Sequence, residues 1–295
     1  MPIAPLQPML AAARAGGYAL GYFEAWDQTS FEAVIAACER AQAPAILGWG
    51  GAITSYDWLE SGGIEQQAGI AMALAERATV PCAVMFNEAK TLAHLERALA
   101  LGANAVMLDS SHLEYAENLA SAAALCQLAH PLGAAVEAEL GRLGDASDPN
   151  SVPELTDPVQ AAEFVAASGV DALAVSVGNV HVMTAGESGV DLERLAAIAE
   201  AVDVPLVIHG GSGYPAWAVR EAIARGVCKF NVGTRLKGRW LRELRAALSA
   251  LPEALDIQQT VGSRNRGDVL ERVREGLIAE ILHMLELYGA AGRVS

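Results

Sequence analysis

Two histidines in this 295-residue sequence stand where apolar runs give way to polar residues. His209 ends the run in "VPLVIHGGSGYP", and His181 lies in "VSVGNVHVM", just after another such run. Imidazoles from neighbouring strands can share one divalent cation, and catalytic zinc sites of this kind keep a position open for substrate. A single histidine at a strand end is also often only a structural residue. Because there are two, we predict that His181 and His209 bind a catalytic metal ion.

Glycine-rich turns follow two of the apolar runs. Gly210, Gly211 and Ser212 come directly after His209, and "NVGT" at 231–234 follows a later run. Backbone N–H groups in such turns, ahead of a helix, favour bound anions such as phosphate. The turns therefore predict an anion site, although tight turning alone would also account for the glycines.

These residues need a scaffold that brings several strand ends together. Apolar, β-rich runs alternate with amphipathic helical segments along nearly the whole chain, which favours a parallel sheet covered by helices. The predicted strands cover 18–25, 45–50, 82–88, 105–109, 134–141, 172–178, 205–211 and 228–233. Eight such units predict an α/β fold, a single-domain (β/α)8 TIM barrel. A doubly wound open sheet is the alternative, but no GxGxxG turn follows the first strand.

The domain organisation follows from this pattern. We predict one domain over residues 1–295, with a C-terminal helical extension that packs on the barrel or on another subunit. The longest irregular stretch, 142–158, is rich in Asp, Pro and Ser and is interpreted as a mobile active-site loop.

Composition excludes several classes of protein. The formal net charge of −15 argues against binding to nucleic acid or to an anionic membrane surface. No apolar stretch is long and clean enough to span a bilayer, and the N-terminus lacks a signal-peptide pattern, so a cytoplasmic location is expected. The four cysteines have no CxxC spacing and are interpreted as small buried hydrophobes.

Polar residues recur at the predicted strand ends. In this fold the chemistry lies at the carboxyl ends of the strands, so these residues should converge in one cavity. They are Glu24, Gly50, Asn87, Glu88, Asp109, Glu139, His181, His209 and Asn231.

Several segments together resemble a known family. They are "MLDSSHLEYAENL", "VEAELGRLG", "GNVHV", "VIHGGSG", "KFNVGT" and "LYGAAGR", in this order. The chain resembles, over nearly its whole length, the class II, zinc-dependent fructose-bisphosphate and tagatose-bisphosphate aldolases. The resemblance implies a dimeric or tetrameric barrel that joins or splits a ketose next to a dihydroxyacetone-phosphate unit. Zinc then polarises the ketone and stabilises the enediolate, while a carboxylic residue carries the proton.

The resemblance also implies roles for individual residues. His181 and His209 become zinc ligands, and Glu139 becomes a carboxylate near the metal or a ligand itself. The substrate and phosphate cradle implied by the resemblance consists of Gly178, Gly210, Gly211, Ser212, Asn231, Gly233 and Thr234.

The sequence departs from the family at several of these strand ends. Where the family reads His-Leu-Asp-His-Gly, this chain reads "MFNEA" at 85–89, so Asn87 replaces the proton-carrying aspartate. Glu88 replaces a zinc histidine and can still bind zinc through oxygen. The family's first-strand asparagine becomes Glu24, a serine becomes Gly50, and a glycine becomes Val182.

We therefore predict a metal-dependent aldolase, a carbon–carbon lyase of carbohydrate metabolism that acts on a sugar or sugar phosphate. The metal ligands are Glu88, His181, His209 and Glu139, and the metal is Zn²⁺ or another divalent ion. Ordinary glycolytic cleavage is not expected, because general acid–base help is worth about 10² to 10⁴ in rate. The alternatives are a metal-assisted sugar epimerase or isomerase and a non-catalytic homologue that acts as a partner subunit.

The missing proton carrier has three candidates. Asn87 can orient an oxygen but cannot accept a proton at neutral pH. Glu24 is preferred because a residue on a strand is held rigidly, and Asp145 and Asp148 in the fifth loop are the alternatives. A homodimer or homotetramer is expected.

Overall fold

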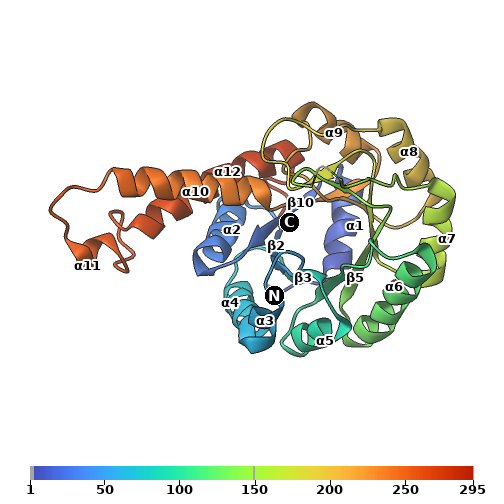
Figure 1. Ribbon diagram of the computed structural model, residues 1–295, viewed down its shortest axis with the longest axis horizontal. Coiled ribbons are helices and arrows are strands. Elements are labelled where there is room, and N and C mark those ends of the chain that lie inside the picture. The colour runs from blue at the N-terminus through green and yellow to red at the C-terminus, as the bar shows by residue number, and fades with distance from the viewer. Residues whose placement is uncertain (1–2, 149, 295) are drawn as a thin grey trace.

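The computed structural model describes residues 3–148 and 150–294 and shows a closed barrel of eight parallel strands inside a ring of helices (Figure 1). The order around the barrel is β1-β10-β9-β7-β5-β4-β3-β2. The strands are β1 Leu20–Ala25, β2 Ala45–Gly50, β3 Cys82–Ala89, β4 Ala105–Leu108, β5 Ala135–Leu140, β7 Ala172–Val175, β9 Leu206–Ile208 and β10 Val227–Val232. Because β1 pairs with β10, with Tyr22 opposite Asn231, the sheet is closed. The TIM-barrel prediction is confirmed, and the open sheet is excluded.

Several helices begin and end at residues that satisfy their terminal backbone groups. Asp27, Thr91 and Asp268 accept backbone N–H groups at helix starts, and Gly17 and Gly289 end helices in the left-handed conformation. The helices are α1 Leu6–Gly16, α2 Gln28–Ala41, α3 Tyr56–Trp58, the π-helix η1 Leu59–Gly63, α4 Ile64–Ala75, α5 Leu92–Ala100, α6 Tyr115–Ala129, the 3₁₀-helix η2 His130–Leu132, α7 Pro158–Ser168, α8 Leu192–Ala201, α9 Ala216–Ala224, α10 Thr234–Ser249, α11 Ile257–Thr260 and α12 Val269–Tyr288.

The barrel core is apolar and tightly packed. The Tyr288 ring at the end of α12 stacks on Phe230 of β10 with ring centroids 4.7 Å apart, and on Phe23 of β1 at 6.4 Å. All four cysteines are free and buried, as predicted from their apolar contexts. Helix α12 therefore seals the junction between the first and last strands.

One part of the barrel interior is shaped by a large and a small residue side by side. A Cβ atom on Gly48 of β2 would overlap the Tyr22 ring of β1 and lie 2.7 Å from the Met85 carbonyl oxygen. Tyr22 thus occupies the space that a side chain at position 48 would fill. Substitution of Gly48 or Tyr22 would therefore disturb the packing inside the barrel below the strand ends.

The loop at 142–158, interpreted from the sequence as mobile, is partly held by backbone pairing. Its two-residue strand β6, Gly144–Asp145, pairs in parallel with β8, Val180–His181, a strand that the sequence did not reveal. Arg142 and Glu154 also exchange two backbone hydrogen bonds of 2.8 Å. The described part of the loop is therefore anchored beside His181, because its backbone finds a partner in the next loop of the barrel.

Helices α10, α11 and α12 form an arm, residues 234–288, that extends to one side of the barrel with α11 at its far end (Figure 1). Large apolar side chains are exposed along it, among them Leu241, Leu248, Ile257 and Val261. The predicted C-terminal extension thus begins earlier than the last helix, at α10. None of the helices in the described residues combines the length and apolar character that crossing a bilayer requires.

We expect Tyr288→Ala to destabilise the fold by about 3 to 5 kcal/mol, because it removes a buried ring that joins α12 to β1 and β10. The urea unfolding midpoint measures this. Val159→Ala, at an exposed position of α7, is the control and should stay within about 0.5 kcal/mol of wild type. Equal midpoints for the two variants would contradict the sealing role of α12.

Candidate active site

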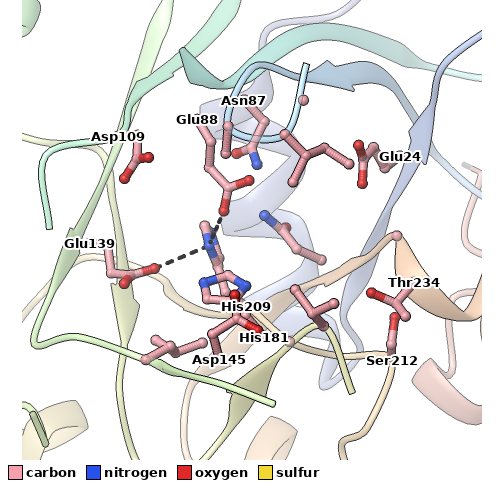
Figure 2. Close-up of a pocket in the computed structure, with 18 of the residues that line it drawn as sticks. Glu24, Asn87, Glu88, Asp109, Glu139, Asp145, His181, His209, Ser212 and Thr234 are labelled. Atoms are coloured by element: carbon pink, nitrogen blue, oxygen red, sulfur yellow. Dashed lines mark hydrogen bonds and ion pairs between the residues drawn. The ribbon is translucent and has the colours of Figure 1, made fainter. Parts of the chain in front are cut away.

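A cavity of about 520 Å³ opens at the carboxyl ends of the barrel strands (Figure 2). Residues far apart in the sequence meet there, as the strand-end argument predicts. The predicted residues that line it are Glu24, Gly50, Asn87, Glu88, Asp109, Glu139, Asp145, His181, His209, Gly210, Ser212, Asn231, Gly233 and Thr234. Gly178 and Gly211 are not among the lining residues.

His209 is the most constrained side chain of the cavity. It is completely buried directly after β9, and three carboxylates surround its ring. Its Nδ1 lies 3.1 Å from Glu88 Oε1 and 3.2 Å from Glu139 Oε2, and its Nε2 lies 2.9 Å from Glu137 Oε1. Burial alone would lower the pKa of His209, but the hydrogen bonds to these carboxylates raise it well above its usual value in the metal-free chain.

Glu137 fixes the orientation of this imidazole from beneath. Its carboxylate accepts from Nε2 of His209 and also from the buried Lys229 ammonium, with Lys229 Nζ 2.8 Å from Glu137 Oε2. Burial would raise the pKa of Glu137, but Lys229 and His209 hold it below its usual range. Lys229 also donates to Asn231 Oδ1 at 2.6 Å. With Nε2 committed to Glu137, His209 presents Nδ1 to the cavity.

A metal ion fits the donor set beside Nδ1. Ligand atoms of Glu88, His181 and His209 all lie within 4.8 Å of one another, a mixed oxygen and nitrogen set that suits zinc. Three carboxylates around one imidazole also need more positive charge than Lys229 and one proton provide, and a divalent cation would supply it. Glu139 is not part of this convergent group, although its carboxylate contacts His209.

Two residues of this site hold an unusual backbone conformation. Glu88 has φ 50° and Val182, next to His181, has φ 54°, both in the left-handed region that side chains other than glycine rarely adopt. The register of β3 against β4 also shifts between Phe86 and Ala89, so Glu88 sits in an irregular part of its strand. Such strain is found where the surroundings force a side chain into a required direction.

Several neutral polar groups face the cavity without protein partners. In the described part of the chain, Asn87 Oδ1, Asn231 Nδ2 and the Tyr22 hydroxyl are buried and unpaired, and all three residues line the cavity. Unpaired buried polar groups are costly in a folded protein, so a ligand or water is expected to pair with them. Burial raises the pKa of Tyr22 well above its usual value, so its hydroxyl stays protonated.

Glu24 has a partner that the sequence interpretation missed. Lys237, in the first turn of α10, places Nζ 2.8 Å from Glu24 Oε1. Burial raises the pKa of Glu24, while Lys237 acts in the opposite direction. The Lys237 ammonium also lies over the Trp26 ring, 5.7 Å from its centroid. Glu24 is therefore ion-paired and not a free base.

The glycine-rich turn after His209 is only partly available to an anion. Gly211 donates its N–H to the Asn231 carbonyl at 2.9 Å, so that donor is already used. A Cβ on Gly211 would come within 2.8 Å of the same oxygen, which explains the glycine by packing. Ser212 Oγ accepts from the Arg235 N–H at 3.0 Å and faces the cavity beside Thr234 (Figure 2).

Gly178, expected in the substrate cradle, has a packing role instead. Its φ is 100°, and a Cβ there would lie 2.8 Å from the Gly189 carbonyl oxygen. Only glycine fits this turn. We therefore assign Gly178 to the backbone that supports His181 and not to the cavity wall.

Other carboxylates at the strand ends differ in how they are held. Asp109, at the end of β4, lies 3.7 Å from Nδ1 of His112, which is longer than a hydrogen bond. Burial, with Glu88 and Glu139 nearby, raises the pKa of Asp109. Asp145 accepts from Ser147, which lowers its pKa, and Asp148 accepts the Asn150 N–H within the exposed loop. Of the two loop candidates for the proton carrier, only Asp145 lines the cavity.

The sequence interpretation missed Glu137, Lys229 and Lys237. A signal existed for the first two, because a charged residue in an apolar strand, two positions from a predicted site residue, must point to the same face. Glu137 precedes Glu139 in this way, and Lys229 precedes Asn231. Lys237 had no such signal, since a lysine in the first turn of a helix is common on protein surfaces.

Comparison with known proteins places this cavity in context. A sequence model of the class-II fructose-bisphosphate aldolases matches residues 4–293. The YdjI aldolase of Escherichia coli K12 has a similar structure, with a TM-score of 0.83 and 27% identity over 99% of this chain and 100% of that one.

Two further solved structures are similar. A putative fructose-1,6-bisphosphate aldolase from Coccidioides immitis gives a TM-score of 0.81 at 27% identity, over 97% of this chain and 96% of that one. The fructose-bisphosphate aldolase of Campylobacter jejuni gives 0.80 at 21% identity, over 99% and 96%, and supports the fold alone.

We expect Glu137→Gln to weaken zinc binding about 10- to 100-fold, because it removes the charge that orients His209 and balances Lys229. His209→Ala should lose most of the bound zinc. Competition with a chromogenic chelator measures both. Glu243→Gln, in a partly exposed ion pair on α10, and His94→Ala, bonded to Glu60, are the controls and should keep full zinc affinity. Stoichiometric zinc in His209→Ala would contradict the assignment.

Proposed function

The chain belongs to the class-II fructose-bisphosphate aldolase family, and from this membership and the geometry of its cavity we propose that it cleaves or forms a ketose sugar or sugar phosphate with the help of zinc or another divalent metal ion. The observation that supports this most is the convergence of Glu88, His181 and His209 at the open end of the barrel. These residues would hold a divalent ion, which would supply a Lewis acid to polarise a ketone and stabilise the charge left when a carbon–carbon bond breaks.

The chain's own residues orient the sugar around that position. Asn87 presents an unpaired amide oxygen, Asn231 an unpaired amide nitrogen and Tyr22 a protonated hydroxyl. Together they favour the neutral hydroxyl groups of a carbohydrate. An amide at position 87 accepts or donates hydrogen bonds without moving a proton. These uncharged groups therefore bind a polyol chain, and a different residue, a carboxylate, must transfer the proton.

Cleavage requires one carboxylate to move a proton. The base removes the proton from the hydroxyl one carbon beyond the ketone's α-carbon. The bond between these two carbons then breaks, its electrons form the enediolate, and the aldehyde leaves. The same acid can return the proton to carbon. We assign this role to Asp109, because its carboxylate lines the cavity and His112 Nδ1 stays 3.7 Å away, beyond hydrogen-bond distance, whereas Lys237 lies 2.8 Å from Glu24.

This arrangement supports a reaction other than ordinary fructose-bisphosphate cleavage. Position 87 lacks the acid expected by resemblance, and Glu24 and Gly50 change the wall of the cavity beside it. A carboxylate on β4 approaches the substrate from a different strand than one on β3. We therefore propose a specialised ketose with a stereochemistry or chain length different from that of the glycolytic substrate.

The proposal is tested by hydrogen exchange at the donor carbon and by cleavage of a ketose panel. The zinc-loaded protein should exchange deuterium into dihydroxyacetone or its phosphate, as measured by NMR, and should stop when the metal is removed. Asp109→Asn should slow exchange about a hundredfold or more with zinc retained. Asp148→Asn, in the exposed loop, is the matched control and should behave as wild type.

Other outcomes would redirect the proposal. If Asp109→Asn exchanges normally and the kcat of Glu24→Gln collapses, the role of proton carrier belongs to Glu24, as the sequence analysis predicts. Isomerised ketose without released aldehyde would identify an epimerase or isomerase. Absence of metal-dependent exchange with either donor and absence of cleavage would contradict the aldolase assignment.

We also propose that the arm, residues 234–288, binds a second copy of this chain. Leu241 and Leu248 lie seven residues apart on α10 and are 61% and 52% exposed. Arg242 and Arg245 beside them are exposed as well. A basic and apolar helix face on a chain of net charge −15 complements the acidic surface of another copy.

A Leu241→Asp/Leu248→Asp variant should shift the protein from dimer or tetramer to monomer, because two charges replace apolar side chains at the contact. Sedimentation equilibrium measures the mass. Val159→Asp on α7 is the control for an added surface charge and should leave the mass unchanged. A wild-type monomer at micromolar concentration would contradict the oligomer.

A further inference from the structure

The Glu24–Lys237 ion pair lies beside the turn that the family resemblance assigns to phosphate. Glu24 is the last residue but one of β1, and Lys237 belongs to the first turn of α10, near Gly233 and Thr234. The two side chains are 18% and 30% exposed, so the pair is mostly withdrawn from solvent. The pair lines the cavity. It lies on the side where, by the family resemblance, the dihydroxyacetone-phosphate part of the substrate binds.

Two glycines make room for the Glu24 carboxylate. A Cβ on Gly233 would overlap Glu24 Oε2, and a Cβ on Gly50 would lie 2.9 Å from Oε1. Neither glycine has a left-handed backbone, so each is explained by space and not by conformation. The carboxylate thus fills a volume that is bounded by the backbone at the start of α10.

This position is one that an anion would otherwise occupy. Helix α10 has 16 residues, and the positive end of its dipole lies at Gly233 and Thr234, where an anionic group is stabilised. Lys237 adds a positive charge at the same end. Glu24 lies against both, so the protein's own carboxylate already uses the positive potential that would attract phosphate.

The other charged side chains of the cavity also disfavour the binding of a phosphate. Its described lining includes five carboxylates, two side chains with a permanent positive charge, Arg142 and Lys237, and three histidines, two of which belong to the candidate metal site. The carboxylates are Glu24, Glu88, Asp109, Glu139 and Asp145. With the two metal-site histidines neutral as ligands, a divalent ion together with Arg142 and Lys237 would still leave the five carboxylates in slight excess. A dianionic phosphate entering beside Glu24 would meet like charge in a partly buried setting, where repulsion is screened little.

We propose, on the basis of the aldolase function above, that the Glu24–Lys237 pair selects a donor that ends in a neutral hydroxyl group and rejects its phosphorylated counterpart. Glu24 accepts a hydrogen bond from that hydroxyl, and Lys237 holds the carboxylate in place. The substrate class is an unphosphorylated ketose, cleaved to a dihydroxyacetone-like fragment and an aldehyde. The fold keeps the turns of a phosphate site, but the Glu24 carboxylate neutralises the positive charge that would attract a phosphate there.

Inorganic phosphate is the first probe. Calorimetric titration of the zinc-loaded protein should show weak phosphate binding in wild type and at least tenfold tighter binding in Glu24→Gln, because the variant frees Lys237 and the α10 terminus. The double variant Glu24→Gln/Lys237→Gln should lose that gain. Glu275→Gln, in the exposed pair with Arg40, removes one negative charge elsewhere and should leave phosphate affinity unchanged.

Donor preference is the second probe. Wild type should exchange deuterium into dihydroxyacetone with a kcat/KM at least tenfold above that for dihydroxyacetone phosphate, and Glu24→Gln should reverse the order mainly through KM. A wild-type preference for the phosphate, or phosphate affinity unchanged in Glu24→Gln, would overturn the selector role while leaving the aldolase intact. If neither donor exchanges, the aldolase proposal fails, and the phosphate titration alone decides the charge argument.

Discussion

The imidazole of His209 is the point on which the active site depends. Its ring is fully buried and its two nitrogens are divided between opposite sides, with Glu137 on one and Glu88 and Glu139 on the other. Glu137 can stay ionised in the barrel interior because Lys229 and His209 lie beside it. The Lys229–Glu137 pair therefore sets the orientation of the His209 ring, and this orientation in turn directs Nδ1 into the cavity. A metal site at this strand end requires the buried pair beneath it.

The barrel sets both where the side chains of the site lie and where they point. Parallel strands bring their carboxyl ends to one rim, but an ordinary strand geometry does not aim every side chain at one point. Glu88 and Val182 adopt the left-handed conformation, and β3 loses its register against β4 at the same place. The cost of such backbone positions, of order 1 to 3 kcal/mol each, must be offset by the surrounding structure. At Val182 the chain accepts this cost although the family resemblance leads one to expect glycine there.

The parts of this structure that the sequence predicts are those set by periodicity and by strand ends. The eight strand runs, the barrel and the convergence of His181, His209 and Glu88 all follow from local patterns. What could not be predicted depends on contacts between distant residues. The pairing of Lys237 with Glu24 joins the two ends of the barrel sheet, 213 positions apart. The pairing of β6 with β8 depends on two loops meeting, and no alternation in either loop signals it.

The substitutions at the rim are best understood as one redistribution of charge. By the family resemblance, an acid is missing at position 87 and carboxylates are added at positions 24 and 88, so the rim carries more negative charge at these positions. Each new carboxylate then needs a neighbour: Lys237 for Glu24, and the imidazole of His209 for Glu88. A single change would leave a half-buried charge unpaired at a cost of several kcal/mol. The carboxylates at positions 24 and 88 are thus physically coupled to the residues that pair with them, and under the proposal above the Glu24–Lys237 pair favours a substrate with a neutral end.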